Sequence, residues 1–236
     1  MKKTVLISLV FSLVLYTLCA CSTNSEKDNE TDMTIDKNCI VGSDYDLLQA
    51  SKPKKGDTIV TFETTKGIVR AVLYADKAPK AVENFVTLAK QGYYNGVKFH
   101  RVIPNFMVQS GDPTGTGSGG ESMWGGKFET ELPEGLYHFR GALAMARQMT
   151  MNTNGSQFYI VQNPKLDVSS ISATGTVRQA YLDFGGYPSL DKQYTVFGQV
   201  FQGLDVVDAI AAKGSSNGTP SETIVINEIK ITEYEG

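Results

Sequence analysis

The hydrophobic and polar positions of the chain follow first a β-type and then a helical period over residues 59–92. Residues 59–74 contain two runs typical of strands on either side of residues 65–67, which predicts a hairpin. A helix is predicted to begin at residues 76–79, because the proline there is tolerated in a first helical turn. Its apolar stripe, with the spacing i, i+3, i+4 and i+7, consists of Val82, Phe85, Val86 and Ala89.

Short apolar runs separated by glycine follow this helix and predict a series of strands. These runs are residues 97–103, 106–108, 142–146, 158–161 and 195–200. A second short helix is predicted at residues 204–211, and a last strand rich in β-branched side chains at residues 224–231. Because the many strands do not alternate with the two helices, the pattern favours a mainly β protein, a barrel, over a parallel βαβ sheet.

The first twenty residues have the pattern of an export signal. Two lysines precede an apolar run over residues 5–18, which is shorter than a typical membrane-spanning helix. The run ends in the sequence Leu-Cys-Ala-Cys, which resembles the bacterial lipobox, in which the last cysteine is lipidated. We expect residues 1–20 to be a lipoprotein signal peptide and Cys21 to carry the lipid. The alternative is an ordinary cleaved signal peptide followed by a chance cysteine.

An acidic, almost wholly polar segment comes next, at residues 22–36. A segment of this composition cannot bury enough apolar surface to order itself. We therefore expect residues 21–56 to form a flexible acidic tether between the lipid and a folded domain at residues 57–236. Cys39 would be a free thiol without a role in this tether. The protein would then be anchored in the bacterial cell envelope, at the periplasmic side or the outer membrane.

Composition and charge exclude several classes of function. Among the 236 residues, 41% are hydrophobic and 20% are charged, which is ordinary for a globular protein, and the net charge of −3 argues against a nucleic-acid binder. No histidine lies near the three cysteines, so a metal site is not predicted, and a disulfide scaffold is not expected either. The two histidines show no spacing typical of a hydrolase. We expect no metal and no cofactor.

Two sequence blocks carry the candidate chemistry, and a third supports them. Residues 99–112 read FHRVIPNFMVQSGD, residues 152–160 read NTNGSQFYI, and residues 190–198 read LDKQYTVFG. In order and spacing these blocks resemble the signature segments of the cyclophilin-type peptidyl-prolyl cis–trans isomerases, and the resemblance extends from about residue 58 to 233. It implies an eight-stranded antiparallel β-barrel capped by two α-helices, with proline-containing polypeptides as substrates. This fold agrees with the pattern of strands and helices above.

The resemblance also implies a role for two polar residues. Rotation about a peptide C–N bond is opposed by a barrier of about 18–20 kcal/mol, because the nitrogen shares its lone pair with the carbonyl. A cation that donates a hydrogen bond to the nitrogen of the twisted state stabilises only the transition state. By resemblance Arg101 is this cation, and a guanidinium suits the role because it stays charged and presents its donors rigidly. Gln109 matches a residue that contacts both this arginine and the substrate.

A proline pocket and a peptide groove are implied in the same way. The pocket residues are Phe106, Met107, Tyr159 and Leu190, with Tyr194 at a position where the family often has histidine. The groove residues are Ala146, Arg147 and Gln157. Three positions depart from common family members: Tyr159 replaces a phenylalanine, Arg147 an asparagine, and Ser189 a tryptophan that favours cyclosporin. We therefore expect weak cyclosporin binding.

Residues 164–188 make the chain longer than compact family members. We expect a long loop with one helical turn, interpreted either as a solvated insertion or as a segment in which Tyr181 and Tyr187, with Arg147, shape substrate choice. Three functions remain open: an isomerase that assists the folding of exported proteins, a module that only binds proline peptides, and a surface-displayed interaction protein. The presence of Arg101 and Gln109 favours the isomerase. Nothing in the sequence requires more than a monomer.

Overall fold

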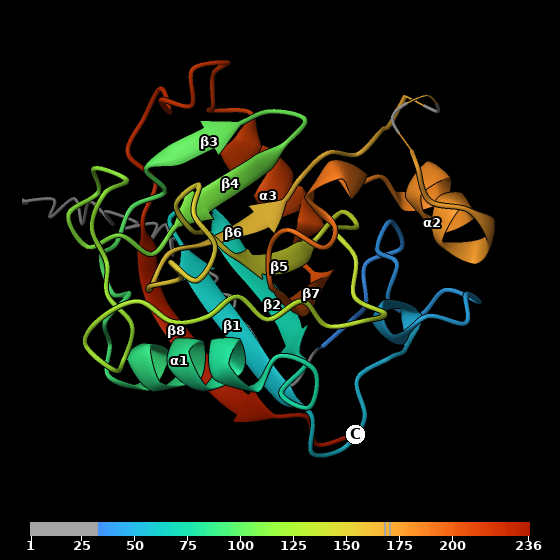
Figure 1. The fold of residues 1–236 in the computed structure, drawn as a ribbon, viewed down its shortest axis with the longest axis horizontal. Helices are drawn as coiled ribbons and strands as arrows, with labels where there is room; N and C mark the ends of the chain where they lie inside the picture. Colours follow the sequence, from blue (N-terminus) through green and yellow to red (C-terminus); the bar gives the residue numbers. More distant parts are fainter. Residues whose placement is uncertain (1–32, 168, 170) are drawn as a thin grey trace, which may run out of the picture. The chain divides into compact units, whose positions relative to one another are not determined.

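Eight antiparallel strands form one curled sheet in the computed structural model, which describes residues 33–167, 169 and 171–236 (Figure 1). The strands are β1 (Thr58–Thr64), β2 (Gly67–Leu73), β3 (Arg101–Ile103), β4 (Met107–Ser110), β5 (Ala142–Met145), β6 (Phe158–Val161), β7 (Val196–Gln202) and β8 (Ile226–Glu233). Their order in the sheet is β3-β4-β6-β5-β7-β2-β1-β8. The prediction of an eight-stranded antiparallel β architecture is confirmed.

The two end strands of this order, β3 and β8, are linked through the segments that precede them. The backbone N–H of Phe99 donates to the carbonyl of Ile224 over 2.9 Å, and the N–H of Gly96 donates to the carbonyl of Ile226 over 2.7 Å. The N–H of Ile226 donates in return to the carbonyl of Val97 over 2.9 Å. Because these bonds satisfy backbone groups next to the sheet ends, they shorten the exposed edge that an open sheet would present.

The predicted hairpin is formed by β1 and β2, with Thr64 opposite Gly67. The Thr64 hydroxyl donates to the Gly67 carbonyl over 2.7 Å and accepts from the N–H of Lys66 over 3.1 Å, which fixes the tight turn. Gly67 has a φ of +130°, and a Cβ there would lie 2.8 Å from a methyl group of Val206. Glycine is therefore required both by the backbone conformation and by the close packing of this turn.

Three α-helices accompany the sheet: α1 (Pro79–Lys90), α2 (Gly175–Phe184) and α3 (Leu204–Ala211). In Figure 1, α1 lies along the lower part of the sheet near β1 and β8, and α3 lies near β3 and β4. The core side of α1 places Phe85 against Phe158 and Phe197, with ring centroids 5.3 and 5.4 Å apart. Both helices predicted from sequence are present, and α3 has the predicted bounds.

The segment that precedes β1 is folded onto the sheet, which corrects the tether prediction for residues 33–56. Cys39, Ile40 and Val41 are buried, and the Cys39 thiol donates to the carbonyl of Val200 over 2.8 Å. The carboxylate of Asp36 accepts from the N–H groups at the start of α3. The tether prediction was based on the acidic composition of residues 22–36. It did not take into account the short apolar run at residues 39–41, which is buried only through contacts with distant parts of the chain. Residues 1–32, with the predicted signal peptide, Cys21 and the first part of the tether, lie outside the described residues.

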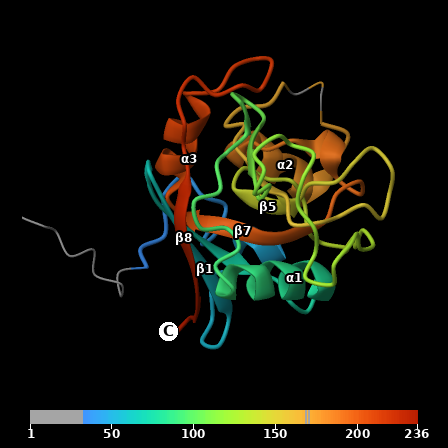
Figure 2. The same ribbon diagram turned by 90° about the vertical axis from the view of Figure 1, so that its left-hand side faces the viewer.

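The insertion contains the ten-residue helix α2, where one helical turn was expected, and its last residue begins the 3-10 turn η3 (Pro188–Leu190). The interpretation as a solvated loop is wrong, because Tyr181 is fully buried. The ring of Tyr181 packs on Phe139, with centroids 4.5 Å apart, and Tyr45 of the N-terminal segment packs edge-on against Phe184. A hydrophobic cluster separate from the main core thus joins residues 33–56 to the insertion. In the view of Figure 2, α2 and α1 lie on different sides of β7.

Among the residues that the structure describes, none of the helices has the length and apolar character needed to cross a lipid bilayer.

Candidate active site

Arg101 and Gln109 face each other across the β3–β4 ladder. Nη1 of Arg101 donates to Oε1 of Gln109 over 3.2 Å, and the arginine side chain is exposed. A guanidinium with one donor held by a neutral amide keeps its charge and its remaining donors for a ligand. The register of this short hairpin therefore presents a fixed cation at the surface of the sheet.

The loop between β3 and β4 brings an aromatic ring under this cation. Asn105 has a φ of +59°, and its N–H donates to Oε1 of Gln162 over 2.8 Å, so the loop is held in a tight reversal. The reversal places the ring of Phe106 with its centroid 5.7 Å from Cζ of Arg101. A cation at this distance is attracted by the face of an aromatic ring. Phe106 thus both supports Arg101 and borders the apolar side of the site.

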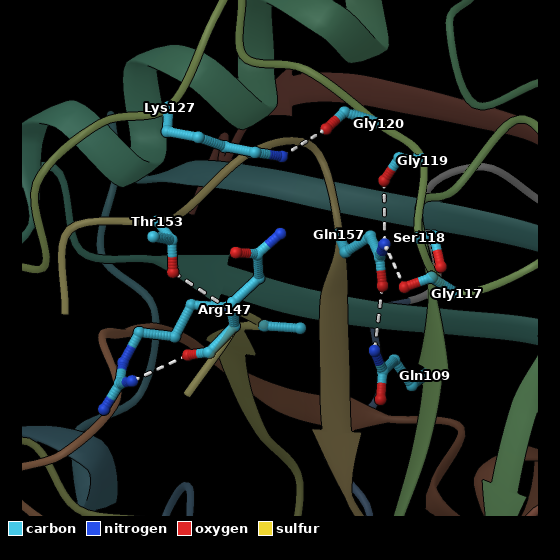
Figure 3. A pocket seen from close by; sticks show the side chains of 12 residues that line it. Gln109, Gly117, Ser118, Gly119, Gly120, Lys127, Arg147, Thr153 and Gln157 are labelled. Atoms are coloured by element: carbon cyan, nitrogen blue, oxygen red, sulfur yellow. Dashed lines mark hydrogen bonds between the residues drawn. The ribbon is translucent and has the colours of Figure 1, made fainter. Parts of the chain in front are cut away.

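A row of amide side chains continues from Gln109 (Figure 3). Nε2 of Gln109 donates to Oε1 of Gln157 over 2.9 Å. Nε2 of Gln157 donates in turn to the carbonyls of Gly119 and Gly117, over 2.8 and 3.1 Å. Because both amide nitrogens are engaged in this direction, the oxygen of Gln109 is left to face Arg101. The row fixes the orientation of the amide that holds the cation.

The glycine-rich loop that receives these bonds is organised by Asp112. Its buried carboxylate accepts from the backbone N–H groups of Thr114, Gly117 and Gly119, over 2.8, 2.7 and 3.1 Å. Burial acts to raise the pKa of Asp112, but these hydrogen bonds outweigh it and hold the pKa well below its usual range. Asp112 therefore stays ionised and keeps the loop in one conformation beside the amide row.

A polar cavity of about 220 Å³ lies between this loop and the segment that follows β5 (Figure 3). Four of the predicted site residues line it: Gln109, Ala146, Arg147 and Gln157. Lys127 and Thr153 also line it, and Nζ of Lys127 donates to the carbonyl of Gly120 over 2.8 Å. Neither residue was predicted for the site from the sequence: Lys127 belongs to no motif, and Thr153 stands in the second sequence block without a role assigned there.

The predicted proline-pocket residues meet in one hydrophobic cluster. It contains Phe106, Met107, Ala146, Tyr159, Leu190 and Tyr194. Met107 and Tyr159 are 1% and 5% exposed, whereas Phe106 and Leu190 are half-buried and can be reached from outside. Tyr159 stands opposite Gln109 in the β4–β6 ladder, so the apolar wall and the amide lie on the same face of the sheet. The cluster therefore adjoins the cation and its amide partner.

Arg147 binds backbone carbonyls and an aromatic ring. Its guanidinium donates to the carbonyls of Gln148, Met149 and Gln193. Its Cζ lies 4.5 Å from the ring centroid of Tyr194. Arg147 thus ties the rim of the polar cavity to the loop that carries Leu190 and Tyr194. Arg147 was predicted only as a residue of the peptide groove, and the structure adds this bridging role for its side chain.

Comparison with known proteins identifies the family. The family described as cyclophilin type peptidyl-prolyl cis-trans isomerase/CLD matches residues 59–231. The chain belongs to the cyclophilin-type isomerases. It is 48% identical over 179 residues to a protein of Staphylococcus saprophyticus named as a peptidyl-prolyl cis–trans isomerase, with 73% of this chain and 90% of that protein covered.

Two further comparisons place this cyclophilin among its relatives. It is 46% identical over 196 residues to a Streptococcus pyogenes protein named as a bifunctional phosphatase/peptidyl-prolyl cis–trans isomerase, and it spans 40% of that longer protein and 79% of itself. The crystal structure of a Cryptosporidium parvum cyclophilin-type isomerase matches with a TM-score of 0.63 at 32% identity, covering 75% of this chain and 99% of that one. A second structure of that protein, in the presence of the dipeptide Ala-Pro, has a TM-score of 0.62.

The site of this cyclophilin brings together every predicted residue that the structure describes. The polar residues Arg101, Gln109 and Gln157 form one hydrogen-bonded row, and the apolar residues form one cluster beside it. Their roles in binding and catalysis stay predictions. The described part of the chain holds no group of three histidine, cysteine, aspartate or glutamate side chains arranged for a metal ion.

The polar residues behind the apolar cluster of the cyclophilin site were not among those predicted from the sequence. His138 was set aside as a metal or hydrolase residue, yet its Nε2 lies 3.0 Å from the hydroxyl of Tyr159. Asp191 stands within the third sequence block, directly after Leu190, and was passed over there. The one available signal was the replacement of phenylalanine by tyrosine at position 159, because a buried hydroxyl needs a polar partner.

Proposed function

We propose that this cyclophilin rotates X-Pro bonds in exported polypeptides while it is attached to a bacterial envelope membrane through a lipid on Cys21. The observation that carries the catalytic part is the exposed guanidinium of Arg101, held by Gln109 beside the apolar cluster. The family and the solved relative in the presence of Ala-Pro support proline-containing peptides as substrates.

In this proposal the apolar cluster holds the proline ring. Large apolar walls desolvate the ring and restrict its movement, so that the part of the peptide before the proline can turn. Phe106 and Leu190 form the accessible rim of the pocket, and Met107 and Tyr159 form its buried wall. No bond to the protein is made or broken, since the reaction is only a rotation about the C–N bond.

Arg101 acts on the twisted state. When the bond is twisted by about 90°, the nitrogen becomes pyramidal and regains the lone pair that it shares in the planar amide. A donor of Arg101 then hydrogen-bonds this lone pair, which the planar ground state does not offer. The interaction therefore lowers the barrier without tightening substrate binding. Gln109 contributes by holding the guanidinium at the surface of β3.

The envelope location is supported by the sequence alone. The apolar run at residues 5–18 and the cysteine at position 21 favour lipidation, and export would place the isomerase among newly translocated chains. Mass spectrometry of the mature protein from bacterial membranes tests this part. An acylated N-terminal peptide that begins at Cys21 is expected, and an unmodified N-terminus would contradict it.

Weak cyclosporin binding is part of the proposal. Ser189 occupies the position where a tryptophan favours the drug, and it is exposed at the rim of the pocket. Without an indole there, cyclosporin loses a large apolar contact and a hydrogen-bond donor. Inhibition of isomerase activity by cyclosporin should be weaker in the wild type than in Ser189→Trp. Equal inhibition constants would contradict this assignment.

The isomerase assay separates catalysis from simple binding. A fluorescent or chromogenic Ala-Pro peptide should relax to its cis–trans equilibrium faster with the protein than without it. A module that only binds proline peptides would shift the populations or retain the peptide without speeding the exchange. Absence of acceleration at protein concentrations that bind the peptide would overturn the proposed function.

A further inference from the structure

Behind the predicted proline pocket, four polar side chains form a network: Tyr159, His138 and Tyr181, which are buried, and Asp191, which is partly exposed. The hydroxyl of Tyr159 lies 3.0 Å from Nε2 of His138, and Nδ1 of His138 lies 2.9 Å from Oδ1 of Asp191. The other carboxylate oxygen, Oδ2, accepts from the hydroxyl of Tyr181 over 2.7 Å. The network runs without a break from β6, which carries Tyr159, to α2 of the insertion, which carries Tyr181.

Burial of His138 and Tyr181 favours a network in which every polar atom has a partner. His138 is 1% exposed and Tyr181 is 0% exposed, so a polar atom left without a partner there would cost the full penalty of desolvation. One neutral tautomer satisfies every atom: the proton on Nδ1 is donated to Asp191, and Nε2 accepts from Tyr159. Burial lowers the pKa of His138 more than Asp191 raises it, which agrees with a neutral ring. The backbone N–H of His138 also donates to Asp191, over 2.8 Å.

The network joins two walls of the pocket that come from different parts of the chain. Tyr159 is one wall, and Leu190 precedes Asp191 directly, so the carboxylate that binds His138 also fixes the backbone next to Leu190. The distance between the two walls is therefore set by two hydrogen-bonded links in series, from Tyr159 to the ring of His138 and from His138 to Asp191. The second link is doubled, because both Nδ1 and the backbone N–H of His138 bond the same carboxylate oxygen. A change at Tyr181 would act on both walls, because it alters the carboxylate that holds them.

The insertion reaches the pocket at a second place. The ring of Tyr187 packs on Phe106, with centroids 4.4 Å apart. The N–H of Tyr187 donates to the carbonyl of His138 over 2.8 Å, so this contact is fixed to the same part of the chain as the network. The insertion thus supports both the buried wall and the accessible rim of the pocket.

We infer that His138, Asp191 and Tyr181 are positioning residues of the proline pocket, through which the insertion sets the spacing between Tyr159 and Leu190. This inference rests on the proposed function, because it takes the apolar cluster to be the proline pocket. None of the three side chains needs to touch the substrate. Their effect is on how well the pocket fits a proline ring, and so on substrate binding more than on the rotation step.

Tyr181→Phe tests the inference with the smallest change. It removes the hydroxyl that binds Asp191 and keeps the ring that packs on Phe139. We expect KM for an Ala-Pro peptide to rise about three- to tenfold, which corresponds to about 0.7–1.4 kcal/mol. The value of kcat should change less than about twofold, because Arg101 and Gln109 are untouched. Equal KM values for Tyr181→Phe and the wild type would overturn the inference.

Tyr45→Phe is the matched control. Tyr45 donates its hydroxyl to Asp183 at the other side of α2 and lies outside the network. Tyr45→Phe should leave KM unchanged, even if Tyr45→Phe and Tyr181→Phe lower the melting temperature to a similar extent. A purely structural role of Tyr181 predicts the opposite pattern, in which the loss of stability is seen without a difference in KM between the two variants, and this pattern would also overturn the inference.

A double-mutant cycle tests the connection itself. In a Tyr159→Phe background the network is already cut at the pocket, so Tyr181→Phe should raise KM by a smaller factor than it does in the wild type. Factors that multiply independently would show that the two hydroxyls are not connected. This would contradict transmission of the effect through His138.

Titration with the dipeptide Ala-Pro, followed by NMR, separates this inference from the proposed function. Peptide binding needs the pocket but not turnover, so weaker binding to Tyr181→Phe than to Tyr45→Phe would support the inference even for a protein without isomerase activity. Equal dissociation constants would overturn it even for an active isomerase.

Discussion

Arg101 and Gln109 stand directly opposite each other on β3 and β4, and the guanidinium of the first donates to the amide oxygen of the second over 3.2 Å. The pairing depends on the register of two very short strands, which the Asn105 reversal sets. The same register places Tyr159 opposite Gln109 on the next strand. A hairpin of few residues thus determines where the cation, the amide and the apolar wall lie relative to one another.

Removal of the cation should abolish most of the rate enhancement. We expect Arg101→Ala to lower kcat/KM about 10²–10³-fold, because one preorganised donor contributes about 3–4 kcal/mol to a transition state. The side chain is exposed, so the melting temperature should change little. Lys90→Ala, which removes a cation at the end of α1, is the control and should keep full activity. Wild-type turnover in Arg101→Ala would show that another group stabilises the twisted bond.

Gly218 should be needed for the position of Arg101. It has a φ of +87°, and a Cβ at this residue would lie 3.0 Å from Cγ of Arg101. Gly218→Ala should therefore displace the arginine and lower kcat/KM about tenfold, in addition to a loss of about 1 kcal/mol in the free energy of unfolding from the strained backbone. Isomerase kinetics and urea unfolding measure the two effects separately.

Gly56→Ala is the matched control for this substitution. Gly56 has a φ of +89°, but a Cβ there would meet nothing within 4 Å. Gly56→Ala should lower the free energy of unfolding by a similar amount and keep the isomerase activity of the wild type. Equal activities for the two alanine variants would mean that Gly218 serves only the backbone conformation.

Asp112 should make the stability of the protein depend on pH in the acid range. Its pKa in the folded protein is depressed below the usual value near 3.8, so its ionised form favours folding. The contribution is complete above that value and is lost as the pH falls toward the folded pKa. The difference in free energy of unfolding between the wild type and Asp112→Asn should therefore be largest near pH 7 and shrink below pH 3.8. A difference that grows with acidity, in urea titrations at several pH values, would contradict this sign.

The regular elements of the fold could be predicted because their signals are local. The hairpin of β1 and β2 and the helix α3 each depend on residues close together in the sequence, and both were found. The folded segment at residues 33–56 and the helix α2 could not be found in this way. Ile40, Phe139 and Tyr181 share one cluster although they lie far apart in the chain, and each looks unremarkable in its own surroundings.

In the candidate site too, the residues with local sequence signals were predicted and those that depend on distant contacts were not. Arg101, Gln109 and the pocket residues stand in compact blocks whose resemblance to a family is strong, and the structure brings them together. The polar partners behind the pocket do not form such a block, because His138 and Asp191 are 53 residues apart and meet only through the tertiary fold. A buried tyrosine hydroxyl needs a polar partner, but the sequence alone does not show which residue supplies it.

Asp36 gives a test of the corrected domain boundary. Its carboxylate accepts from the N–H groups of Gly203 and Leu204, over 2.8 and 2.9 Å, and so caps α3 from a segment more than 160 residues away in the sequence. Asp36→Ala should lower the free energy of unfolding by about 1 kcal/mol, the usual cost of a lost helix cap. Asp44→Ala, at an exposed position of the same segment, should have almost no effect. If residues 33–56 were a mobile tether, both substitutions would be neutral in urea unfolding, so a measurable difference between them decides where the folded unit begins.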